Sequence, residues 1–66
     1  MSDEQKAAYV NAQAVACMCE LQGMLALNAE RERAGHSPAY DDGAFIDLPA
    51  RFAITHNQVL GLFHDR

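Results

Sequence analysis

Cysteine is scarce in this chain of 66 residues, which contains only Cys17 and Cys19. Both fall in a stretch that we expect to be helical, where residues two apart point about 200° away from each other. They therefore cannot bridge each other or share a metal ion, which excludes a disulfide framework. Free thiols fit the reducing cytosol. A chain this short forms one domain, residues 1–66, whose core alone rarely supplies more than about 3–5 kcal/mol.

Positive charge is also scarce. The chain has five Lys and Arg residues and nine Asp and Glu residues, which gives a net charge of −4. Such a charge disfavours passive binding to DNA or to anionic lipid. Long apolar runs are absent, since the stretch 14–27 is interrupted by Glu20, Gln22 and Gly23 and is too short to cross a bilayer. The polar, acidic N-terminus is unlike a signal peptide. We therefore expect a cytoplasmic protein that does not enter membranes.

Motifs for catalysis and for cofactor binding are missing too. The sequence has no Gly-rich phosphate loop, no nucleophile elbow and no paired catalytic carboxylates. Its three histidines, His36, His56 and His64, are scattered, and no calcium-loop spacing follows Asp41 and Asp42. We therefore expect no enzymatic activity, no cofactor and no metal site.

Helical signals dominate what is present, and no strand-like alternation is visible. No proline occurs before Pro38, and alanine is abundant. Ser2 and Gln5 have the spacing of a capping box, and Gly35 is a natural helix stop. We predict one long N-terminal helix over about residues 3–34, which would span about 48 Å.

Two short helices are predicted to follow and to pack on the long one, which gives an all-α fold. The first covers about residues 44–53, where an apolar stripe has helical spacing: Phe45, Leu48 and Phe52. Pro49 falls inside this stretch and is tolerated only near a first helical turn or at a kink. The second covers about residues 56–64 and begins after a capping box formed by Thr55 and Gln58.

The predicted long helix is apolar on two faces, whereas an ordinary surface helix has one apolar stripe. The bulky face comprises Val10, Ala14, Cys17, Met18, Leu21 and Leu25. The opposite face carries only small residues: Ala12, Ala16, Cys19, Gly23 and Ala26. Because the short helices can cover only the bulky face, we expect the small-residue face to form the interface of a homodimer. The alternative is that alanine is there only because it is a good helix former.

Three acidic residues, Asp41, Asp42 and Asp47, lie close together in the sequence. The simplest interpretation is a solvated surface. The sharper hypothesis is an acidic patch that binds a basic surface on another protein, whose identity the sequence leaves open.

The segment 45–63 resembles the helix-turn-helix of DNA-binding proteins. Residues at the characteristic apolar, turn and cap positions carry the resemblance: Leu48, Phe52, Ala53, Ile54, Thr55, Val59 and Leu62. It implies a second helix that reads the major groove. The candidate DNA-binding residues are Arg51, Thr55, His56, Asn57 and Gln58, of which Asn and Gln can read adenine edges.

The segment also departs from the helix-turn-helix pattern. Pro49 stands where the family usually has alanine, and Ala53 replaces the usual turn glycine. From residue 37 onward, two arginines are outnumbered by four aspartates, although phosphate neutralisation supplies much of the affinity for DNA. The net charge therefore disfavours DNA as the partner.

The run 6–14 and the segment 56–60 resemble short helical proteins encoded by phages and prophages. This resemblance implies a small accessory factor that modulates a host or phage protein. We therefore predict a dimeric protein-binding module, with a helix-turn-helix transcription regulator as the alternative. A third possibility is a dimeric component of a larger assembly.

Overall fold

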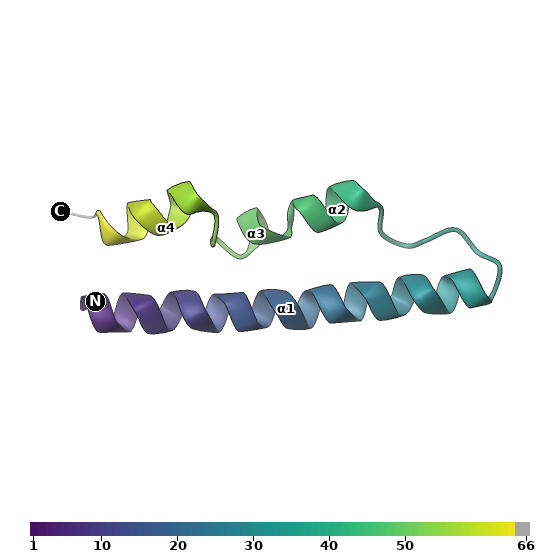
Figure 1. The fold of residues 1–66 in the computed structure, drawn as a ribbon, viewed down its shortest axis with the longest axis horizontal. Helices are drawn as coiled ribbons and strands as arrows, with labels where there is room; N and C mark the ends of the chain where they lie inside the picture. The colour runs from purple at the N-terminus through teal and green to yellow at the C-terminus, as the bar shows by residue number, and fades with distance from the viewer. Residues whose placement is uncertain (65–66) are drawn as a thin grey trace.

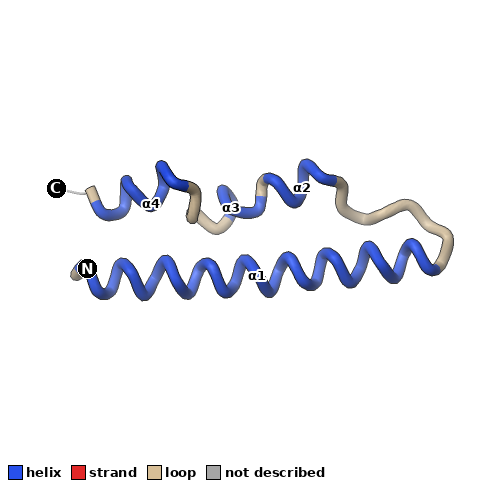
Figure 2. Tube along the Cα trace, in the orientation of Figure 1, coloured by secondary structure: helices blue, strands red, loops and turns tan. Residues whose placement is uncertain are grey.

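The chain folds back on itself as two layers of helix. The computed structural model describes residues 1–64. Helix α1 (Asp3–Arg33) is one layer, and α2 (Asp42–Ile46), α3 (Leu48–Arg51) and α4 (His56–Phe63) follow one another back along it (Figure 1). Loops join these helices, and the described residues contain no strand (Figure 2). The prediction of an all-α fold with one long N-terminal helix is thus confirmed.

Local signals place both ends of α1. The Ser2 Oγ accepts a hydrogen bond from the Gln5 N–H at 3.1 Å, and the Ser2 N–H donates to Gln5 Oε1 at 2.8 Å. At the other end, Gly35 has a φ of +80° and the His36 N–H donates to the Arg31 carbonyl at 2.8 Å. This is the pattern of a Schellman stop, in which glycine takes the left-handed position. The predicted capping box and the predicted stop are both present.

The segment predicted as one helix over residues 44–53 consists of two short helices. Helix α2 ends at Ile46, Asp47 caps it, and α3 begins at Leu48. Proline lacks an N–H and is tolerated only in the first turn of a helix. The break at Asp47 therefore places Pro49 in the first turn of α3. Helix α4 begins where the Thr55–Gln58 capping box predicts.

The apolar core between the layers is thin. Met24 and Leu48 are its buried members, and the residues around them are only half-buried: Val10, Ala14, Cys17, Leu21, Phe45, Phe52, Ile54, Val59 and Leu62. The buried face of α1 is rotated from the predicted bulky face, because Met24 is inside while Met18 and Leu25 are exposed. A core this small gives a chain of this length little stability of its own.

Polar side chains of α1 fix the position of the returning segment, which comprises α2, α3, α4 and their loops. They donate hydrogen bonds to its backbone carbonyls at three points along α1. The pairs are Gln13 Nε2 to Phe52 at 3.0 Å, Asn28 Nδ2 to Tyr40 at 2.9 Å and Arg31 Nε to Ser37 at 2.7 Å. These bonds occupy carbonyls in stretches without regular helix, which otherwise need water as a partner. The rotation of α1 is therefore set as much by polar contacts as by apolar ones.

Charged side chains add two contacts between the layers. Lys6 is buried, with 5 % of its surface exposed, and its Nζ lies 5.8 Å from the centre of the Phe63 ring. Arg51 Nη2 lies 3.6 Å from a carboxylate oxygen of Glu20, in an exposed ion pair. Lys6 thus anchors α4 beside the start of α1, while Arg51 joins α3 to the middle of α1.

Candidate interaction surfaces

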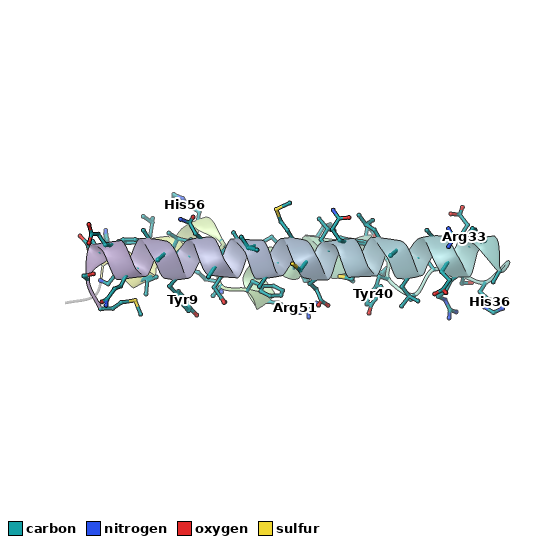
Figure 3. The ribbon with its side chains drawn as sticks, turned by 90° about the horizontal axis from the view of Figure 1, so that it is seen from below. Tyr9, Arg33, His36, Tyr40, Arg51 and His56 are labelled. Atoms are coloured by element: carbon teal, nitrogen blue, oxygen red, sulfur yellow. The ribbon has the colours of Figure 1, made fainter. Side chains whose placement is uncertain are left out.

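The side of α1 that faces away from α2, α3 and α4 is exposed along its whole length. Figure 3 views the molecule from this side, with α1 in front of the returning segment (Figure 3). We call the surface the outer face and define it by eight exposed residues: Ala8, Ala12, Val15, Ala16, Met18, Cys19, Gly23 and Ala26. The structure therefore brings the five predicted interface residues together on one uncovered surface.

The outer face combines small residues with two larger apolar ones, and the exposed polar side chains of Gln22 and Glu30 lie on the same side of α1. A Cβ built at Gly23 would meet nothing within 4 Å, so the backbone of α1 is open there. Val15 and Met18 lie beside the small residues, and 60 % of Met18 is exposed. Small residues allow a second helix to approach the backbone closely, while larger neighbours supply apolar area. Sequence reasoning missed the contribution of Met18, because it placed this residue on the buried face.

The three predicted acidic residues lie around helix α2. The Asp41 carboxylate accepts a hydrogen bond from the Ala44 N–H at 3.1 Å and caps the helix. The Asp41 side chain therefore stabilises the start of α2. Asp42 and Asp47 are exposed, and Asp47 caps α2 through its backbone N–H while its carboxylate makes no cap hydrogen bond. The predicted patch thus exists as a surface, with two of its three carboxylates turned to solvent.

Ile46 is an exposed apolar residue in the middle of this acidic surface. It lies one helical turn from Asp42 and directly before Asp47, and 73 % of it is exposed. Sequence reasoning missed Ile46. Its position in the sequence could have indicated its exposure, because Ile46 lies outside the apolar stripe of Phe45 and Leu48, which faces inward. We call the set of Asp41, Asp42, Ile46 and Asp47 the acidic patch.

The candidate DNA-binding residues are largely engaged within the chain. Gln58 Oε1 accepts from the Thr55 N–H at 3.1 Å, and Gln58 Nε2 lies 3.3 Å from the Ala50 carbonyl. Arg51 is paired with Glu20. His56 and Asn57 are exposed at the start of α4, and they belong neither to the capping box nor to the ion pair of Arg51.

The turn before α4 keeps one feature of the helix-turn-helix pattern. Ala53 has a φ of +58°, the left-handed conformation that the usual glycine adopts. The Ala53 N–H donates to the Ala50 carbonyl at 3.1 Å and the Ile54 N–H donates to the Pro49 carbonyl at 2.9 Å. These two bonds form a second Schellman motif. The first helix of the pair, α3, is a single turn of four residues.

Other surfaces offer little chemistry over residues 1–64. No pocket and no cluster of three or more metal-ligating side chains is found there. Both cysteines are free thiols, Cys19 exposed and Cys17 half-buried. None of the described helices has the length and apolar character needed to span a bilayer.

Comparison with known proteins adds no further constraint. No family model matches the chain, and neither a curated protein nor a solved structure matches it. The outer face and the acidic patch are therefore the observations on which a function is argued.

Proposed function

We propose that this chain is a small, non-enzymatic, cytoplasmic protein-binding module. Two copies join through the outer face of α1, and each copy presents its acidic patch to a basic surface on another protein. The exposed Ile46, surrounded by aspartates, is the observation that carries the second part of the proposal. An accessory regulator of this kind fits a phage- or prophage-encoded protein.

The accessible surface of the single chain supports the homodimer. It amounts to 4897 Å², whereas a compact monomer of 7.3 kDa exposes about 4,200 Å². The excess of roughly 700 Å² approaches the ~800 Å² that each partner buries in a standard interface. Burying the apolar side chains of the outer face would also supplement a core that has few buried members. The area and the thin core thus favour a second copy as the occupant of the outer face.

The acidic patch supports a basic protein partner. Interfaces commonly place one apolar anchor in the centre and polar groups at the rim. Ile46 provides an anchor, and the carboxylates of Asp42 and Asp47 provide a negative rim. Because the whole chain carries a net charge of −4, its field also steers it toward positively charged surfaces.

Affinity capture from the source cell, with the wild-type chain, two patch variants and one control variant compared side by side, tests this function. Ile46→Ser removes the apolar anchor, and the double variant Asp42→Lys with Asp47→Lys reverses the rim. We expect both to lose a basic protein that the wild type retains. Glu32→Lys, at an exposed acid of α1, is the matched control and should retain that protein. Equal capture by all four chains would refute the acidic patch as the binding surface.

A helix-turn-helix DNA-binding regulator is the second candidate, and the left-handed turn at Ala53 is the observation that favours it. In this case His56 and Asn57, exposed at the start of α4, would contact DNA. A mobility shift with duplex DNA at about 50 mM salt, where phosphate contacts are strongest, tests it. Weakening of the shift by Asn57→Ala would support the regulator, and the absence of a shift would reject it.

A further inference from the structure

One edge of the molecule, where the side of α1 meets the side of the returning segment, is rich in exposed apolar side chains. Figure 3 shows Tyr9 and Arg51 at one edge and His56 at the other. Around α1, Met18 lies about 180° and Leu25 about 160° from Tyr9, so both project toward the edge of His56. Met18 is 60 % exposed and Leu25 is 47 % exposed. The second layer therefore leaves these two large side chains uncovered.

Helix α4 adds two apolar side chains to the same edge. Leu60 and Phe63 lie about 40° and 20° from His56 around α4, and both are exposed. Because the Phe63 ring contacts Lys6, this part of α4 lies beside the first turns of α1. We call this surface the lateral face and define it by six residues: Ala14, Met18, Leu21, Leu25, Leu60 and Phe63.

The spacing of the lateral-face residues on α1 is that of a contact between helices. Ala14, Met18, Leu21 and Leu25 follow one another at intervals of four, three and four, the heptad spacing with which two helices pack at a small angle. Ala14 and Leu21 are half-buried, whereas Met18 and Leu25 are exposed. The returning segment thus covers only one border of this heptad pattern. A further helix lying along the edge would contact α1 and α4 together.

The two ends of the lateral face are both negative. Asp3 and Glu32 are exposed, and each lies within about 40° of Leu25 around α1. The Lys and Arg residues that the structure describes all lie elsewhere, about 80° or more around α1 from Leu25 or at the opposite edge: Lys6, Arg31, Arg33 and Arg51. Two copies overlapping along this face would therefore place acid against acid at both ends, in a parallel and in an antiparallel pair alike. A second copy is thus a poor occupant.

We propose that the lateral face binds an amphipathic helix of another protein, with basic residues near both ends of that helix. Its apolar side packs on the heptad pattern of α1 and on Leu60 and Phe63 of α4. Its basic ends face Asp3 and Glu32, which are about 44 Å apart along α1, so charge complementarity selects it over a second copy. The bound helix also enlarges a core in which Met24 and Leu48 are the buried apolar members. This site goes beyond the proposed function, because it does not use the acidic patch.

Titration of the full chain with a synthetic helical peptide tests the site. The probe has about four heptads with Leu at the a and d positions, Lys in its first and last heptads and Gln elsewhere. A second peptide carries Glu in place of every Lys. We expect the Lys peptide to bind with a Kd in the micromolar range at low salt, and the Glu peptide to bind about tenfold more weakly or not at all.

Matched variants locate the binding. Leu25→Ala should weaken the binding of the Lys peptide about tenfold, whereas Leu27→Ala should not, because Leu27 is an exposed leucine about 160° away around α1. Glu32→Lys should weaken binding about fivefold. Glu30→Lys makes the same change in net charge on the other side of the helix and should leave binding unchanged. Leu60→Ala should weaken binding as Leu25→Ala does, because α4 forms part of the site.

Three results would overturn the site. The first is equal weakening by both members of a matched pair, which would show unspecific attraction. The second is no binding of the Lys peptide at about 100 μM, where even weak complexes form. The third is self-association that Leu25→Ala abolishes, which would place a second copy on the lateral face. Far-ultraviolet circular dichroism establishes that each variant remains helical. All variants leave the acidic patch unchanged, so capture of a basic protein by that patch reports on the proposed function separately.

Discussion

The side chain of Asn28 and the backbone of Tyr40 exchange two hydrogen bonds. Asn28 Nδ2 donates to the Tyr40 carbonyl at 2.9 Å, and the Tyr40 N–H donates to Asn28 Oδ1 at 3.0 Å. The side-chain amide of Asn28 thus satisfies both backbone groups of Tyr40, which lies in the loop between α1 and α2. Both bonds are partly buried, so their loss leaves two backbone groups poorly satisfied.

Asn28→Ala should therefore lower the free energy of unfolding by about 1–3 kcal/mol, measured by urea unfolding followed by circular dichroism. Asn11→Ala is the matched control, because Asn11 is exposed on the same helix and alanine is the better helix former. The control should leave stability unchanged or raise it slightly. If both substitutions have the same effect, the amide does not hold the loop.

The turn before α4 yields a second prediction, because Ala53 has a left-handed backbone that glycine adopts without strain. Ala53→Gly should raise the free energy of unfolding by about 0.5–1 kcal/mol, since an L-residue pays for this conformation. Ala50→Gly, three residues earlier in helix α3, should lower stability by about as much. Destabilisation by Ala53→Gly would contradict the left-handed turn. Thermal unfolding of the two variants under identical conditions provides the comparison.

The helix ends could be predicted from the sequence because they depend on residues within one turn. The Ser2–Gln5 and Thr55–Gln58 capping boxes and the stop at Gly35 need only their own neighbours. The break at Asp47 is also a local consequence of Pro49. The prediction allowed a kink at Pro49 but kept one helix over 44–53, since the apolar stripe continues on both sides of the break.

The rotation of α1 could not be predicted in the same way. Apolar residues surround the helix, so hydrophobic pattern alone does not select the buried side. Gln13 and Asn28 determine which side of α1 is buried, because they point inward and donate hydrogen bonds to carbonyls of the returning segment. Those carbonyls are 39 and 12 residues away, which no local pattern encodes. Met24 is consequently buried while Met18 is left outside.

Cysteine oxidation gives a third prediction, which tests the outer face in the native sequence. Cys19 is exposed on that face, whereas Cys17 is half-buried toward the other layer. Mild copper-catalysed air oxidation should therefore produce a disulfide between the Cys19 residues of two copies, seen on a non-reducing gel. Cys17→Ser should still form this species, and Cys19→Ser should not. Formation by both variants alike would indicate random collision between chains.

Replacement of Gly23 gives the fourth prediction, in which folding and self-association change in opposite directions. Within one chain, a Cβ at Gly23 meets nothing within 4 Å, so Gly23→Ala should stabilise α1 by about 1 kcal/mol through helix propensity alone. In the proposed dimer, the added methyl group would push the second helix away. Dimer dissociation, measured by sedimentation over a dilution series, should therefore become easier, while unfolding at the dilute limit becomes harder.

Gly61 in helix α4 is the matched control for Gly23, because it is also exposed, helical and free of neighbours within 4 Å. Gly61→Ala should give a similar gain in the free energy of unfolding and should leave dimer dissociation unchanged, since α4 lies on the other layer of the molecule. A Gly23→Ala variant that is stabilised like Gly61→Ala and associates like the wild type would show that the second copy does not contact Gly23. The comparison thus isolates one position of the outer face, at which the same methyl group favours the helix and opposes the dimer.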